Sequence, residues 1–176
     1  MMIYAREDIP SKELNKHTFT NNVEGMFIEI NLRKRKLLFF GTYHSTHIEY
    51  GCSHENYFKE VGFALDAYNG YEMFLLAGDF NIEENEGHLQ DFLLEYNASN
   101  LVKKPTCFKS LSNSSCIDLF LTNFPRSFQN TDTVSTGLSD FHKMVVTVLK
   151  TTLKLSLKSY NIEITNILWQ KTIVKN

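Results

Sequence analysis

The stretch Met73-Phe74-Leu75-Leu76-Ala77-Gly78-Asp79-Phe80-Asn81 contains the pattern that decides the fold of this chain. Its five apolar residues form a short run that ends at a glycine, which predicts a buried strand. The strand would then end with an acid, Asp79, and an amide, Asn81. Proteins with α/β folds usually bind ligands at strand ends, so these side chains are candidates for a reacting centre. A polar turn is the alternative interpretation, because Asp and Asn are common turn residues.

Length and composition favour one globular domain. The 176 residues are 43% hydrophobic and include 14 Phe, enough to build a core. A net charge of −2 argues against a protein that coats nucleic acid through a general basic excess. The three cysteines lack CxxC spacing, which favours reduced thiols in an intracellular protein of the nucleus or cytoplasm. A secretory signal is not recognisable, and no apolar run approaches the ~20 residues of a membrane span.

Hydrophobic periodicity predicts strands interleaved with two helices. Apolar residues at helical spacing predict a helix over residues 53–69, with Ser53 as its N-cap, and a second helix over about residues 87–96. Residues 7–22 and 103–115 are polar and predicted to be irregular, and a polar connection that contains Pro125 is predicted before the last strand. Strands are predicted at residues 2–5, 25–32, 37–40, 73–77, 117–121 and 144–149. This order, with several adjacent hairpins, predicts an α/β sandwich of mixed sheets.

Two local clusters each have two interpretations. The basic block at residues 33–36 is predicted to be a solvated hairpin turn, and a nuclear-import or phosphate-contacting role is the alternative. His44 and His47, with His54 nearby, could suggest a metal cluster. They lack the Cys or acidic partners of a standard zinc pattern, so solvent-facing histidines are the preferred prediction.

Two further acidic motifs follow along the chain. Asp118 interrupts the apolar run of residues 117–121, and a buried carboxylate needs a partner. That partner could be a catalytic histidine, whose tautomer the acid would fix, or backbone amides or a structural Lys or Arg. The second motif, Gly137-Leu138-Ser139-Asp140-Phe141-His142, places an acid and an imidazole beside the last predicted strand.

Taken together and in this order, the three motifs resemble the endonuclease/exonuclease/phosphatase family. They are most similar to the endonuclease domain of non-LTR retrotransposons, which is associated with a reverse transcriptase. The resemblance extends to residues 3–10, 24–43 and 105–109, and it covers about residues 1–149. It implies two packed mixed β-sheets flanked by helices, a four-layer sandwich, for a domain at residues 1–150. Residues 151–176 would be a C-terminal extension.

The resemblance implies a hydrolase that uses Mg²⁺ or Mn²⁺ to cleave phosphodiester bonds in DNA. By this resemblance, Asp79 would position or activate the attacking water. Asn81 would hold the scissile phosphate or support Asp79, and Tyr43 would lie near the same phosphate. A divalent metal and a general base together lower the barrier to in-line attack on phosphorus.

The acid and imidazole side of the implied site departs from the family pattern. Asp118 would orient the catalytic imidazole, and Asp140 would be an acid on the metal side together with Asp79. The family order is Ser-Asp-His, whereas here Phe141 follows the acid and His142 comes one residue later. A shift of one residue on a strand turns a side chain to the opposite face, so His142 would reach Asp118 only through a bulge or bend.

A second departure concerns the start of the chain. The family places a strand with an Asn and a strand with a metal-ligand Glu before the segment that residues 1–10 resemble. We therefore expect the first strands of the fold to be missing, a sheet edge to be exposed and activity to be impaired. The alternative is a non-enzymatic remnant that binds nucleic acid or protein, through residues 33–36 and the lysines Lys103, Lys104 and Lys109.

Overall fold

The computed structural model describes residues 2–20, 22–32, 35–45, 47, 51–110, 113–150, 152–155 and 158–161. The strands are β1 (Ser11–Leu14), β2 (Glu24–Leu32), β3 (Arg35–Tyr43), β4 (Met73–Asp79), β5 (Ser99–Asn100), β6 (Cys107–Ser110), β7 (Asn113–Ser115), β8 (Asp118–Thr122), β9 (Phe128–Val134), β10 (Met144–Leu149), β11 (Thr152–Leu155) and β12 (Lys158–Asn161). The helices are α1 (His54–Ala67), α2 (Gly87–Glu95) and a short 3₁₀ turn, Pro125–Ser127. Half of the basic block and most of the C-terminal extension lie outside the described residues.

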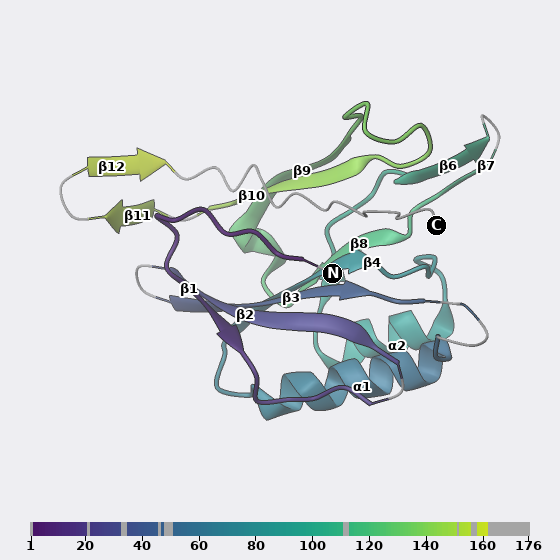
Figure 1. Ribbon diagram of the computed structural model, residues 1–176, viewed down its shortest axis with the longest axis horizontal. Coiled ribbons are helices and arrows are strands. Elements are labelled where there is room, and N and C mark those ends of the chain that lie inside the picture. The colour runs from purple at the N-terminus through teal and green to yellow at the C-terminus, as the bar shows by residue number, and fades with distance from the viewer. Residues whose placement is uncertain are drawn as a thin grey trace.

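A mixed sheet lies at the centre of the molecule (Figure 1). Within the described ranges it has six strands in the order β1-β2-β3-β4-β8-β5. Strands β3 and β4 run parallel, and α1 forms the crossover between them, while the other neighbours are antiparallel. Helices α1 and α2 cover one face, and β9–β10 and β6–β7 lie over the other (Figure 1). The predicted α/β sandwich with mixed sheets is therefore confirmed.

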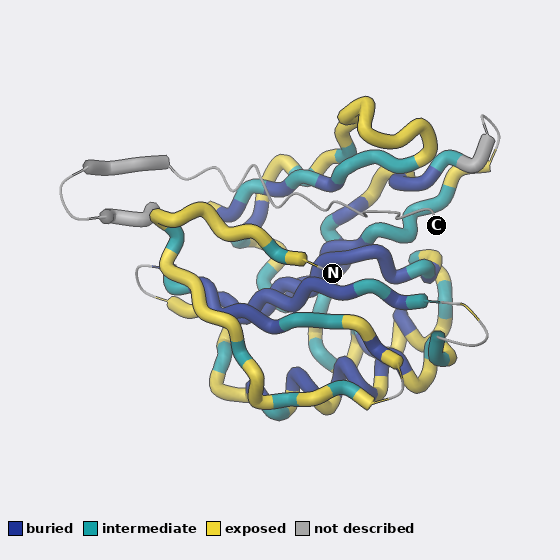
Figure 2. Tube along the Cα trace, in the orientation of Figure 1, coloured by how far each residue is buried: buried dark blue, intermediate teal, exposed yellow. Residues whose placement is uncertain are grey.

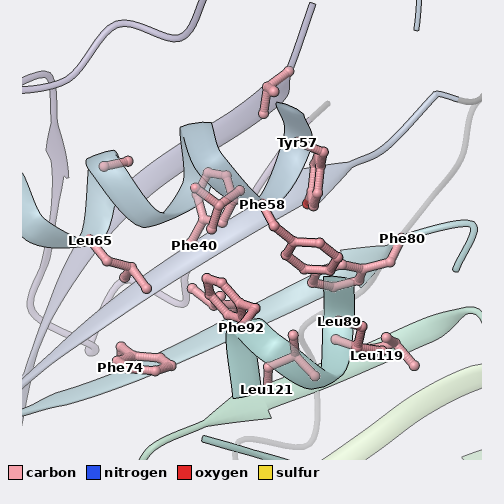
Figure 3. Packing of buried hydrophobic residues seen from close by; sticks show 14 of the residues in the cluster. Phe40, Tyr57, Phe58, Leu65, Phe74, Phe80, Leu89, Phe92, Leu119 and Leu121 are labelled. Carbon is pink, nitrogen blue, oxygen red and sulfur yellow. The ribbon is translucent and has the colours of Figure 1, made fainter. Parts of the chain in front are cut away.

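Aromatic side chains fill the layer between the sheet and the helices (Figure 3). Phe40, from β3, and Leu76, from β4, are completely buried beneath Tyr57 of α1. Helix α1 begins as predicted, because the Ser53 side chain accepts a hydrogen bond from the Asn56 N–H. No helix in the described ranges combines the length and apolar character that crossing a membrane would need.

A second apolar layer lies on the opposite face of the sheet. Phe39, Leu75 and Phe120, from three neighbouring strands, pack in one cluster with Val145 and Leu149 of β10. Strand β4 is buried along its whole length because both faces are covered (Figure 2). This double covering explains why its sequence is a continuous apolar run rather than an alternating one.

Four predictions about local structure were wrong. The predicted loop at residues 103–115 contains the hairpin β6–β7, and residues 7–22 contain β1, which pairs with β2. The polar connection before the last strand contains β9, and residues 2–5 form no strand. These strands are short or largely exposed and carry many polar side chains. Their pairing depends on backbone hydrogen bonds, which hydrophobic periodicity does not encode.

Candidate active site

Three of the predicted site residues lie in one row across the central sheet. Tyr43 at the end of β3 is the register partner of Asp79, and Asp79 is the register partner of Asp118 at the start of β8. Residues directly opposite each other in a sheet share a face. Phe80, the next residue after Asp79, packs in the core on the helix side, so the row faces away from the helices.

Gly78 allows the ends of β3 and β4 to lie this close. A Cβ atom at this position would be 1.9 Å from the backbone oxygen of Thr42 and 3.0 Å from that residue's side-chain methyl carbon. Thr42 is itself fixed, because its hydroxyl contacts the Glu24 backbone oxygen at 2.9 Å and the Tyr57 hydroxyl at 2.8 Å. A glycine is therefore needed before Asp79, because any larger residue would push β3 and β4 apart where the row lies.

The turn after β4 is held by Asn81. This residue has a left-handed backbone conformation (φ 50°), and its N–H donates to Asp79 Oδ1 at 3.1 Å. Its side-chain nitrogen donates to the His44 backbone oxygen at 2.8 Å, while the His44 N–H donates to the Asp79 backbone oxygen at 2.9 Å. Asn81 thus fastens the segment after β3 to the segment after β4, which supports the position of Asp79.

His44 is a buried structural residue, whereas the sequence predicted an exposed one. It is 1% exposed, so the prediction of a solvent-facing histidine was wrong for this position. Its ring nitrogens lie 2.8 Å from the Phe80 backbone oxygen and 2.9 Å from that of Cys52. The ring also packs against Tyr57, with 4.4 Å between ring centroids. The closeness of its ring to two backbone carbonyls could not be seen from the His-x-x-His spacing.

Thr106 connects Asp118 to the segment that carries the third motif. The side chain is fully buried, and its hydroxyl accepts hydrogen bonds from the N–H groups of Ile117 at 3.2 Å and Asp118 at 3.1 Å. Its backbone oxygen accepts from the Lys143 N–H at 2.8 Å. In the sequence, Thr106 belongs to the segment 105–109 that resembles the family, but no pattern there indicates its role.

Replacing Thr106 by valine is expected to lower the free energy of unfolding by about 2–3 kcal/mol, because two part-buried N–H groups lose their acceptor. Urea unfolding followed by circular dichroism measures this change. Thr18→Val, at an exposed position, is the matched control and should remain within about 0.5 kcal/mol of the original protein. Equal stability of the two variants would contradict the bracing role of the Thr106 hydroxyl.

Asp140 and His142 lie in a separate turn before β10. The Ser139 hydroxyl accepts hydrogen bonds from the N–H groups of Phe141 and His142, and Asp140 is exposed. His142 forms a bridge with Cys107, and its Nε2 lies 3.8 Å from the Cys107 sulfur. The imidazole of His142 thus lies beside Cys107, while Phe141 is 57% exposed.

The row of Asp79 and Asp118 has the donor chemistry of a magnesium site. Asp79 is only 3% exposed, and it is the register partner of Asp118, so the two carboxylates lie on the same face of the sheet. Mg²⁺ prefers carboxylate oxygens and commonly takes only one or two from the protein, keeping waters and phosphate oxygens as its other ligands. Two carboxylates therefore fit this ion. Within the described residues, no larger group of three or more His, Cys, Asp or Glu could hold a metal ion.

A cysteine nucleophile does not suit this site. Burial, followed by the nearby charges of Glu84 and Asp118, raises the pKa of the Cys116 thiol to about 11. The thiol is therefore neutral at physiological pH, and the neutral thiol is a poor nucleophile.

A cavity of about 200 Å³ between α1 and α2, lined by Phe58, Phe92 and Tyr96 among others, lies on the opposite face of the sheet from the row.

Comparison with solved structures identifies the architecture. The endonuclease domain of TRAS1, a telomere-specific non-LTR retrotransposon, matches with a TM-score of 0.61 and 14% identity, over 77% of this chain and 64% of that domain. An endonuclease/exonuclease/phosphatase family protein from Leptotrichia buccalis matches with a TM-score of 0.50 and 15% identity, over 69% and 53%. The human Nocturnin catalytic domain, with bound sulfate, matches with a TM-score of 0.50 and 14% identity, over 69% and 50%.

This chain thus spans between half and two thirds of the length of these three structures. No family model matches the sequence, and no curated protein matches it significantly. The similarity is therefore one of three-dimensional structure. At these low sequence identities it shows a shared fold. The chain resembles the endonuclease/exonuclease/phosphatase family and has its fold.

Proposed function

We propose that this chain is a Mg²⁺-dependent phosphodiester hydrolase domain of retrotransposon origin that nicks DNA slowly. The observation that carries the proposal is the row of Tyr43, Asp79 and Asp118 at the strand ends of this fold. An acid pair beside a phenol hydroxyl offers oxygen ligands for a divalent cation and a donor for a phosphate oxygen. The fold match to a retrotransposon endonuclease domain supports the choice of DNA as substrate.

In this proposal each group has a defined role. Asp79 holds and orients the attacking water and, together with Asp118 opposite it, provides the carboxylates of the metal site. Asp140, as a further acid on the metal side, and His142, as the imidazole beside Asp118, would take their predicted roles only after the 139–142 turn moved toward the row. Tyr43 and Asn81 position the scissile phosphate. Mg²⁺, when bound, would stabilise the negative charge that develops on the phosphate oxygens.

Slow turnover follows from the placement of the third motif. His142 lies against Cys107, and Asp140 lies in an exposed turn, so neither belongs to the row in the central sheet. A general base contributes its full effect only within hydrogen-bond reach of the proton that it removes. Rearrangement of the 139–142 turn would have to precede each reaction in which these two residues take part.

The alternative of a non-enzymatic binding remnant has less support from the charges on the surface. Lys103 pairs with Glu84 at 2.6 Å, and Lys104 pairs with Asp132 at 2.8 Å. Lys36, from the basic block, pairs with Glu29 at 3.0 Å. Neighbouring carboxylates thus offset much of the positive charge that the sequence suggested for phosphate contacts.

Nicking of supercoiled plasmid tests the proposal. Residues 1–176 should convert supercoiled DNA to relaxed circles slowly in Mg²⁺ or Mn²⁺, and EDTA should stop the conversion. Asp91→Asn, on α2 at the far side of the sheet, is the matched control and should nick at the original rate. Folded protein that gives no nicks with either metal would contradict the enzymatic proposal, and rapid nicking would contradict slow turnover.

A further inference from the structure

A short strand pairing places two phenylalanines side by side on one face. The Phe108 N–H donates to the Phe141 backbone oxygen at 2.7 Å, and the Lys143 N–H donates to the Thr106 backbone oxygen at 2.8 Å. Cys107 and His142 lie between these two bonds as an antiparallel bridge pair. Opposite residues in an antiparallel pair share a face, and neighbours along a strand alternate between faces. The face opposite to Cys107 and His142 therefore carries the side chains of Thr106, Phe108, Phe141 and Lys143.

This face combines an exposed aromatic ring with a positive charge. Phe141 is 57% exposed, although large apolar side chains are usually buried. The ammonium of Lys143 lies 4.4 Å from the centroid of the Phe108 ring, and the Phe108 N–H donates to the Phe141 backbone oxygen. An aromatic ring stacks on the flat face of any nucleobase, and a nearby lysine attracts the adjoining phosphate. An exposed ring with a cation on the same face therefore favours single-stranded nucleic acid over an uncharged partner.

The same face adjoins the candidate active site. Thr106 lies opposite Lys143, and its hydroxyl accepts a hydrogen bond from the Asp118 N–H at 3.1 Å. Thr106 therefore connects Lys143 to the Asp118 backbone through two hydrogen bonds. A nucleotide next to a phosphate bound at the row could extend onto this face.

We propose that Phe141 and Lys143 form a stacking platform that binds an unpaired base adjacent to the scissile phosphate. Phe141 stacks on the base, and Lys143 contacts the backbone phosphate of the same strand. The platform makes single-stranded or locally unpaired DNA the preferred substrate class. This inference rests on the proposed function for the position of the scissile phosphate, but base stacking can be measured without cleavage.

Binding of a fluorescently labelled single-stranded oligonucleotide, measured by anisotropy in EDTA, tests the platform. Phe141→Ala should weaken binding about ten-fold, because stacking on one ring contributes about 1–3 kcal/mol per base. Phe63→Ala is the matched control: Phe63 is similarly exposed, at 61%, but lies on α1 across the sheet, and its loss should leave affinity unchanged. Lys143→Gln should reduce the slope of the logarithm of the binding constant against the logarithm of the salt concentration by about one, because one phosphate contact is lost.

Phe141→Trp provides a readout that general unfolding would not give. This variant should bind the oligonucleotide about as tightly as the original protein, and its added indole fluorescence should be quenched on binding relative to the background of Trp169. The same sequence as a duplex should bind more weakly than the single strand. Equal affinities for the original protein, Phe141→Ala and Phe63→Ala would overturn the platform, as would failure to bind single strands. A protein that stacks but never nicks would refute only the proposed function.

Discussion

Gly78→Ala is expected to lower the free energy of unfolding by about 3 kcal/mol or more, the largest stability effect that we predict for a change of one methyl group. The added Cβ would lie 1.9 Å from the Thr42 backbone oxygen. A backbone atom in the middle of a sheet cannot move aside as a flexible side chain can. Strands β3 and β4 would have to separate, which would break the parallel pairing between Tyr43 and Asp79.

Chemical unfolding in urea, followed by circular dichroism, measures the effect. Gly70→Ala is the matched control, because a Cβ at position 70 has no atom within 4 Å. The control should change stability by less than about 1 kcal/mol. If both variants unfold at the same urea concentration, the close approach of β3 to β4 at position 78 is wrong.

The central strand and both helices could be predicted from the sequence because their side chains are strongly patterned. Strand β4 is apolar throughout since both faces are covered, and α1 has a buried stripe at helical spacing. The motifs around Asp79 and Asp118 also indicated a common site. Their exact opposition could not be predicted, because the register between β4 and β8 is set by pairing across many intervening residues.

Other parts of the site left no pattern in the sequence. The hairpin β6–β7 is short and polar, and it is placed by backbone hydrogen bonds to segments distant in sequence, such as that from Lys143 to Thr106. The roles of Thr106 and His44 depend on single buried hydrogen bonds, which residue type alone does not reveal. The position of His142 beside Cys107 likewise depends on tertiary contacts, although its one-residue shift was visible.

Asp79→Asn is expected to reduce Mg²⁺-dependent nicking by about 100-fold or more, the range found when a positioned acid or base is removed. The substitution keeps the size of the side chain and an oxygen that can accept from the Asn81 N–H. It removes one of the two opposed carboxylates, and so it should also weaken Mg²⁺ binding. The original protein should gain about 2.7 kcal/mol of stability when Mg²⁺ is present at a hundred times its dissociation constant. The variant should gain much less at the same concentration.

Two readouts separate loss of the site from loss of the fold. In EDTA, Asp79→Asn should keep the circular-dichroism spectrum and the cooperative urea unfolding of the original protein, because the asparagine retains the size of the side chain and an oxygen acceptor for the Asn81 N–H. Asp118→Asn should behave in the same way, whereas Asp91→Asn on α2 should keep both nicking and the full response to Mg²⁺. A variant at Asp79 that nicks normally, or that Mg²⁺ stabilises as much as the original chain, would show that the carboxylate row is not the metal-dependent centre. Such a result would separate the shared fold from the shared chemistry, because the row would then be a structural feature of the sheet.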